Sequence, residues 1–192
     1  HEQISPARMS LNRAMYRRGV GDALPLYLTA IPFALVIGLA VVQSGLNPLV
    51  GWSTSPLVFG GAAQLVLITL LGSGTAVAAT IAAALVIQAR HLMYSAALAP
   101  TFQRQPRWFQ WLGPYALIDQ MFALASTRTH ESPEDFRSYY LGAGTVYVVG
   151  WNLTTAVGLL IGPSVPESWR LDFAIPLMFV VLLVAGINRW PK

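Results

Sequence analysis

The chain has 192 residues and a net charge of +4, with only 10% charged residues against 55% hydrophobic ones. A typical soluble domain carries roughly 25% charged residues, and here no Asp, Glu, Lys or Arg occurs from residue 23 to residue 89. A soluble domain of this size could not keep so long an apolar run out of water. The composition therefore argues against a soluble enzyme or a nucleic-acid-binding protein, and the basic excess fits loops beside an anionic membrane surface.

About six apolar segments follow one another along the chain, separated by turn-forming or polar residues. A bilayer core needs about 20 apolar residues per helix. The segments are 23–44, 55–71, 75–99, 108–127, 133–162 and 173–188. Backbone groups in hydrocarbon must be paired internally and alternation at strand period is absent, so these segments predict helices rather than a barrel. Ser132 is predicted to cap the fifth helix, with Pro133 as its first residue.

We therefore predict an all-α fold, a polytopic membrane helical bundle whose helices are interrupted by Pro and Gly. Residues 1–22 form a basic cytoplasmic segment, residues 23–188 a single transmembrane domain, and residues 189–192 the end of an incomplete C-terminal part. Because the sequence opens on His1 rather than Met, we also expect N-terminal processing. The similarity of the segment 22–25 to the segment 172–176 is compatible with an inverted repeat.

The distribution of Lys and Arg predicts that the N-terminus is cytoplasmic. With that orientation, the cytoplasmic side holds Arg8, Arg13, Arg17, Arg18, Arg128, Arg137, Arg189 and Lys192, and the outer side holds Arg104, Arg107 and Arg170. If the segment 55–71 re-enters instead of crossing, this asymmetry is almost lost, so full crossing is favoured. Aromatic residues near segment ends predict an interfacial belt formed by Trp52, Trp108, Trp111, Tyr139, Tyr140, Trp169 and Trp190.

Four polar side chains lie deep inside four different apolar segments: Gln64, Gln88, Asp119 and Asn152. Polar groups at such depth are costly and usually face the interior of a bundle or a cavity. Interhelical hydrogen bonding explains the three amides equally well. Asp119 is harder to explain by packing, because a carboxylate in lipid must be paired, protonated or hydrated.

Arg90 and His91 are the cationic candidates inside a segment. Arg90 either reaches the outer interface or turns inward to pair with Asp119, and His91 is either a packing residue or a proton carrier. On one continuous helix, Gln88, His91 and Ser95 would form a polar stripe. A triad of Ser95, His91 and Asp119 would be the basis of an intramembrane hydrolase, but no nucleophile elbow or other enzyme motif accompanies it. We expect no enzyme activity, cofactor or metal.

Pro and Gly mark the places where helices are interrupted. Pro32 frees a backbone carbonyl one turn earlier, which could accept from an ammonium group. Gly60 and Gly61 allow a break whose N–H groups could bind a carboxylate. Interrupted apolar segments are typical of transporter sites, although tolerated kinks explain them as well. Ala34 and Gly38 form a face of small residues suited to close packing, and Ala79 and Ala83 form another.

Five motifs in order resemble the signatures of the AzlC family. They are FGGAAQ at 59–64, QARHLMYS at 88–95, IDQMFAL at 118–124, YYLGAGTVYVVGWNLTTAVGLLIG at 139–162 and LDFAIPLMF at 171–179. The resemblance covers about residues 19–184. Gln88 departs from the Asn that is more usual before the Arg-His pair, and the family commonly continues through further apolar sequence after the position of Lys192.

The resemblance implies the large subunit of a bacterial inner-membrane exporter of branched-chain amino acids, working with a small AzlD-type membrane subunit. Leu, Ile, Val and Met are the expected substrates, because one methylene in an apolar pocket is worth only about 1–3 kcal/mol. The lipid bilayer is the expected surroundings, nucleic acid is not an expected partner, and a higher oligomer is compatible with the small-residue faces. A non-transporting scaffold and a passive small-solute channel remain the alternatives.

A zwitterionic substrate sets the requirements of the transport site. Its carboxylate needs donors, for which Arg90 or the N–H groups near Gly60 and Gly61 are candidates. Its ammonium needs an acceptor, either Asp119 or the carbonyl freed near Pro32. Since no nucleotide-binding motif is present, an ion gradient is the expected energy source. Either Asp119 or His91 would carry the coupled proton.

Overall fold

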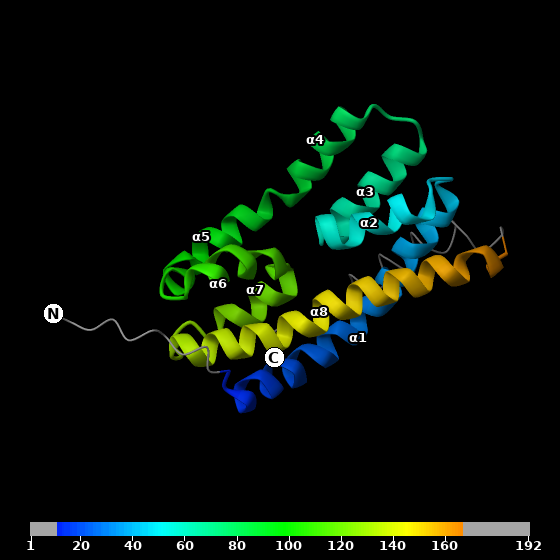
Figure 1. Ribbon diagram of the computed structural model, residues 1–192. Coiled ribbons are helices and arrows are strands. Elements are labelled where there is room, and N and C mark those ends of the chain that lie inside the picture. The colour runs from blue at the N-terminus through cyan, green and yellow to red at the C-terminus, as the bar shows by residue number, and fades with distance from the viewer. Residues whose placement is uncertain (1–10, 167–192) are drawn as a thin grey trace, which may run out of the picture. The chain divides into compact units, whose positions relative to one another are not determined.

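A computed structural model describes residues 11–166, and every regular element in that range is a helix (Figure 1). The helices are α1 (Arg13–Gln43), α2 (Pro48–Val58), α3 (Gly61–Gly72), α4 (Val77–Gln88), α5 (Arg90–Gln103), α6 (Arg107–Leu112), η1 (Gly113–Ala116), α7 (Asp119–Ser126), α8 (Pro133–Ile161) and η2 (Gly162–Ser164). By length and composition, α1 and α8 can each cross a membrane, and α4 with α5 would make a third span if counted together. The predicted segment 173–188 and the second half of the suggested repeat lie outside the described residues.

Three of the predicted segments are divided. The break that Gly60 and Gly61 were expected to allow is confirmed, whereas continuous helices over 75–99 and 108–127 were a wrong expectation. The segment 55–71 is interrupted at Phe59 and Gly60, where Phe59 has a left-handed φ of 44° and Gly60 is extended. The segment 75–99 is interrupted at Ala89, which leaves Gln88 on α4 and His91 on α5. The predicted polar stripe of residues 88, 91 and 95 on one helix is therefore wrong. The segment 108–127 consists of α6, η1 and α7.

The predicted start of the fifth helix is confirmed. α8 begins at Pro133, and the backbone N–H of Asp135 donates to the Ser132 side chain over 3.1 Å. Proline suits the first helical position because its missing N–H would have no partner there in any case.

The described chain divides into two compact units. The first unit contains residues 11–24 and 90–147, and the second contains residues 25–89 and 148–166. The boundaries fall inside α1 and α8, so each unit holds one part of each long helix. Each unit is described by itself below.

An aromatic cluster forms the core of the first unit. The rings of Phe102 and Phe109 stack with centroids 5.3 Å apart, and Tyr140 meets Phe102 edge to face at 5.5 Å. Tyr139 and Tyr140 are only 1% and 2% exposed. The Tyr140 hydroxyl donates to the Gly113 carbonyl over 2.8 Å. These two tyrosines are core residues, so their assignment to an interfacial belt was wrong.

Close helix packing organises the second unit. A Cβ atom added to Gly38 of α1 would collide with the Thr155 carbonyl of α8 and lie 2.6 Å from the backbone carbon of Gly158. Ala34, one turn earlier on α1, is fully buried. The predicted packing face of Ala34 and Gly38 is thus confirmed. On the other side of this unit α3 and α4 form a hairpin, with Ala63 and Ala84 in its core (Figure 1).

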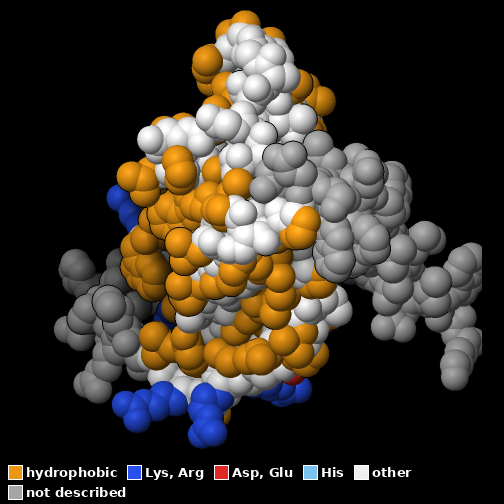
Figure 2. Space-filling view, turned by 90° about the vertical axis from the view of Figure 1, so that its right-hand side faces the viewer, with side chains coloured by type: hydrophobic (Ala, Val, Ile, Leu, Met, Phe, Trp, Pro, Cys, Tyr) orange, Lys and Arg blue, Asp and Glu red, His pale blue; other side chains and the backbone are white. Residues whose placement is uncertain are grey.

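Large apolar side chains remain exposed in rows along single helix faces. On α4 the exposed row contains Val77, Ile81 and Leu85, and on α8 it contains Val149, Leu153 and Val157. Members of each row are four residues apart, so they share one face of their helix. Figure 2 shows hydrophobic side chains over much of the visible surface. Such apolar rows on helices of this length are what a lipid-facing surface requires.

Candidate functional site

An ion pair joins two predicted site residues in the first unit. Arg90 is the first residue of α5 and Asp119 the first residue of α7. Arg90 Nη1 lies 3.0 Å from Asp119 Oδ2, and the Tyr94 hydroxyl donates to Asp119 Oδ1 over 2.6 Å. Of the two alternatives for Arg90, the structure therefore has the inward pair. The side chains of Arg90 and Asp119 are 35% and 41% exposed, so burial does not lock the ion pair in place.

Aromatic rings surround this carboxylate. The Tyr94 ring stacks on Phe122 with centroids 4.5 Å apart, and the His91 ring lies 5.9 Å from Tyr94 in a tilted arrangement. His91 Nε2 is buried and makes no hydrogen bond. The sequence prediction missed Tyr94, although it lies four residues after Arg90 and so shares its helix face.

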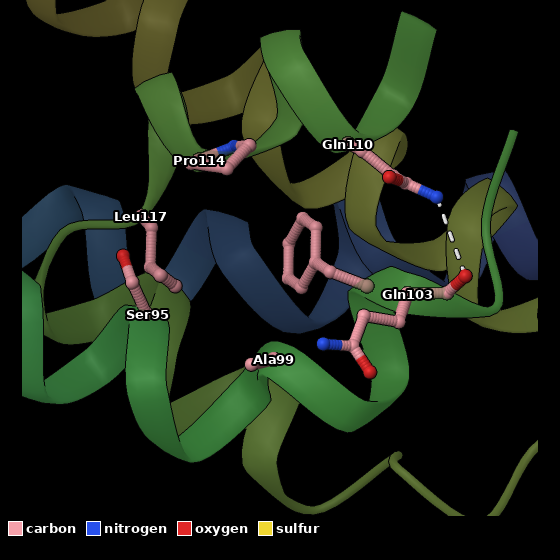
Figure 3. Close-up of a pocket in the computed structure, with 7 residues that line it drawn as sticks. Ser95, Ala99, Gln103, Gln110, Pro114 and Leu117 are labelled. Carbon is pink, nitrogen blue, oxygen red and sulfur yellow. Dashed lines mark hydrogen bonds between the residues drawn. The ribbon is translucent and has the colours of Figure 1, made fainter. Parts of the chain in front are cut away.

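A cleft lies beside the same helix in the first unit (Figure 3). Its lining consists of Ser95, Ala99, Phe102, Gln103, Gln110, Pro114 and Leu117. Figure 3 shows Ser95 and Ala99 on one wall, facing Pro114 and Leu117, and Gln110 donating to the Gln103 carbonyl over 3.3 Å. Within residues 11–166, no hydrogen bond joins Ser95 to His91.

A charged cluster of the first unit was not predicted. Asp22 Oδ2 accepts from the Tyr139 hydroxyl over 2.9 Å and from Arg128 Nη2 over 3.2 Å. Arg128 also donates to Glu131 over 2.8 Å, and its guanidinium lies 4.4 Å from the centre of the Tyr139 ring. The hydrogen bond to Glu131 raises the pKa of Arg128, although burial opposes this. The cluster fixes the α7–α8 loop to α1 and α8 within the first unit.

A helix break holds two other predicted residues in the second unit. Phe59 is the C-cap residue of α2, and its N–H donates to the Ser55 carbonyl. Gly60 is the N-cap residue of α3 and supplies no side-chain cap. Gln88 Nε2 donates to the Val58 carbonyl over 3.1 Å, while its Oε1 is buried and makes no hydrogen bond. A Cβ atom on Gly60 would lie 2.6 Å from that Oε1. The Gln88 amide therefore covers the break.

Gln64 lies one turn into α3 and is fully buried. Its Oε1 accepts from the indole Nε1 of Trp151 over 2.9 Å, while its Nε2 makes no hydrogen bond. Trp151 meets Phe33 edge to face, with centroids 5.8 Å apart. A Cβ atom on Gly61 would contact both rings. The sequence prediction missed Trp151 and Phe33, since nothing local marks them as partners of the amide.

The two remaining predicted residues take other positions. The Asn152 side chain donates to the Val148 carbonyl of its own helix over 2.8 Å, which is a bond within α8 and not one between helices. The Asn152 carbonyl accepts from the indole of Trp52 over 3.1 Å. Pro32 lies inside α1, which continues as a helix through it. Within residues 11–166, no three or more metal-binding side chains form a group that could hold a metal ion.

Comparison with known proteins places this chain in a family. The family model described as AzlC protein matches residues 25–165. The chain belongs to the AzlC family. This confirms the resemblance carried by the motifs around Gln64, Arg90 and Asp119.

Curated relatives of this AzlC-family chain are membrane proteins. It is 24% identical over 183 residues to the inner membrane protein YgaZ of Escherichia coli, covering 92% of this chain and 75% of that protein. It is 28% identical over 179 residues to a membrane protein of Archaeoglobus fulgidus, covering 91% and 77%. A membrane protein of Helicobacter pylori is 24% identical, covering 88% and 75%. No solved structure matches this member of the AzlC family.

Proposed function

We propose that the chain is the large subunit of a secondary active exporter of branched-chain amino acids. It moves Leu, Ile, Val and Met out across the bacterial inner membrane, together with a small AzlD-type subunit. Membership of the AzlC family and the similarity to an inner membrane protein support this proposal. The proposal includes a multi-pass topology with about six spans, a cytoplasmic N-terminal segment over residues 1–22 and a membrane domain over residues 23–188.

The observation that carries the proposal is the Arg90–Asp119 ion pair. Both charges lie in a chain that has few of them, and both are partly exposed. A transporter driven by a proton gradient needs a titratable side chain, such as a carboxylate, that binds a proton on one side of the membrane and releases it on the other. When a proton binds Asp119, the carboxylate becomes neutral and Arg90 loses its counter-charge. The Arg90 side chain is then released, which is a local change that a transport cycle can use.

Tyr94 contributes to the same step. Its hydroxyl donates to Asp119 Oδ1, while Arg90 contacts Oδ2, so each oxygen of the anionic carboxylate has a donor. His91 is the second candidate for proton coupling, because its ring lies beside Tyr94. A variant of each residue separates these two roles.

Labelled leucine in proteoliposomes tests the proposal. We expect outward transport when the chain and its small partner are both present, and we expect it to stop when the proton gradient is collapsed. Asp119→Asn should abolish the dependence on the gradient, and Arg90→Gln should reduce transport. Arg107→Gln is the matched control, because Arg107 is exposed at the start of α6 and outside this ion pair.

The two alternatives give different results in the same assay. A passive channel gives leucine flux that persists after the gradient collapses. A scaffold gives no flux, and Arg90→Gln then reduces recovery of the assembled complex instead. If His91→Gln removes the dependence on the gradient and Asp119→Asn does not, the coupling role belongs to the histidine. Export unaffected by either variant would refute proton coupling at this cluster.

A further inference from the structure

We propose that the break between α2 and α3 binds the substrate itself. The first N–H groups of α3 and Gln64 Nε2 bind the carboxylate of an α-amino acid, and Gln88 Oε1 accepts from its ammonium group. The substrate class rests on the proposed function above. The residues of this site belong to the second unit, whereas the Arg90–Asp119 pair belongs to the first.

The start of α3 has free hydrogen-bonding capacity. The first N–H groups of any α-helix have no partner within the helix and carry partial positive charge. Gly60, the N-cap residue, supplies no side-chain acceptor. Neither Gly60 nor Gly61 has a side chain, but the Gln88 amide fills the space beside Gly60, and the rings of Phe33 and Trp151 fill the space beside Gly61. A ligand therefore reaches this backbone only after the Gln88 side chain moves. A carboxylate is the substrate group that fits such an end.

Gln64 supplies the second, independent observation. An indole N–H can only donate, so the atom of Gln64 that faces Trp151 must be its carbonyl oxygen. The amide nitrogen is therefore the atom without a partner, on a side chain that is fully buried. Helix side chains lean toward the N-terminus, which brings the Gln64 amide over the first turn of α3. Buried donors are rarely left unpaired, so this donor indicates a ligand acceptor.

Gln88 has an unpaired acceptor, which complements the unpaired donor of Gln64. The Val58 carbonyl can only accept, so the Gln88 nitrogen faces it and the Gln88 oxygen is left without a partner. This oxygen lies beside Gly60. An unpaired donor and an unpaired acceptor thus lie on α3 and α4 around one break. That combination matches a zwitterion and involves no net charge on the protein.

Aromatic side chains supply the apolar part of the site. The Trp151 ring lies beside Gly61, and its indole N–H donates to the Gln64 side chain. Phe33 packs against the Trp151 ring. These rings give an aliphatic substrate side chain an apolar surface. To admit the substrate, the Gln88 side chain must turn away from Gly60, where its amide is the closest neighbour. Such rotation is open to a flexible side chain and not to the backbone.

Competition binding tests the carboxylate contact on the full chain with its partner subunit, in lipid nanodiscs. Labelled leucine is displaced by leucine, by 3-methylbutylamine, which lacks the carboxylate, or by 4-methylpentanoate, which lacks the ammonium. Gln64→Leu should weaken leucine binding by about tenfold or more, the usual effect of losing a hydrogen bond to a charged group. Binding of 3-methylbutylamine should change little, because the lost contact is to the carboxylate. Gln103→Leu, the same substitution at the exposed end of α5 in the first unit, should leave both affinities unchanged.

Gln88→Leu provides the second arm, because it leaves the Gln64–Trp151 bond in place. It should weaken leucine binding and leave 4-methylpentanoate binding unchanged. If Gln64→Leu fails to fold, this arm alone decides the outcome. Equal loss for leucine and its analogue in a variant, or no loss at all, overturns the inference while export by the wild type still supports the proposed function. If the wild-type complex neither binds nor exports leucine, both proposals fail.

Discussion

Gly38→Ala should destabilise the protein, although it replaces glycine by the best helix-forming residue. Gly38 lies inside α1, where the Thr155 carbonyl and the Gly158 backbone of α8 already occupy the space of a Cβ atom. Both neighbours are backbone atoms, so no side-chain rotation can relieve the collision. Ordinary carbon–oxygen contacts begin at about 3.3 Å. The two helix segments must therefore separate by about 1 Å at this point.

Two opposing effects determine the size of the change. Adding a methyl group to a well-packed site costs about 1–3 kcal/mol. Alanine in place of glycine in a helix interior returns about 1 kcal/mol. Because the collision involves backbone, the first effect should exceed the second by about 1–2 kcal/mol. For a protein of this size, this corresponds to a Tm lower by about 2–8 °C.

Gly21→Ala is the matched control on the same helix. A Cβ atom on Gly21 would have no neighbour within 4 Å, so only the gain in helix propensity applies. We expect its Tm to rise by up to about 4 °C. Thermal unfolding of the purified protein in detergent, followed by circular dichroism, measures both variants. If Gly38→Ala raises the Tm as much as Gly21→Ala does, α1 and α8 do not approach each other at Gly38.

Three further substitutions test local contacts. Asp22→Asn should lower the Tm by about 2–4 °C, because Arg128 and Tyr139 lose a charged acceptor that is itself partly exposed; an unchanged Tm would show that the cluster adds no stability. Ser132→Ala should cost about 1 kcal/mol in a denaturant titration, because α8 loses its N-cap; no loss would contradict this cap. Tyr94→Phe keeps the ring on Phe122 but removes a donor to Asp119. Leucine export in the proteoliposome assay should therefore fall, and unchanged export would contradict a role for this contact.

Features that depend on neighbours in sequence were predictable. The Ser132–Pro133 start of α8 is a local capping pattern, and the structure has it. The packing face of Ala34 and Gly38 was visible as two small residues one turn apart. The Arg90–Asp119 pair was one of two alternatives for Arg90, because an acid in an apolar segment has few cations with which to pair.

Features that depend on distant partners were not predictable. Tyr139 looked like an interfacial aromatic residue, and only its bond to Asp22, 117 residues away, makes it a core residue. The partner of Gln64 is Trp151, 87 residues away, and no periodicity relates them. The interruption at Ala89 has no local signal, because alanine is the strongest helix former. Ala79, read as part of a packing face, is exposed, while its neighbour Thr80 is buried.

The left-handed backbone of Phe59 has a consequence for how rigid the end of α2 is. A helix commonly ends in this conformation at a glycine, which adopts it without strain. Phe59 is instead 3% exposed, and its N–H is bonded to Ser55. The buried ring holds this residue in place, so the turn between α2 and α3 is rigid. The first backbone N–H groups of α3 are then already oriented before the proposed substrate binds, so binding costs little conformational entropy.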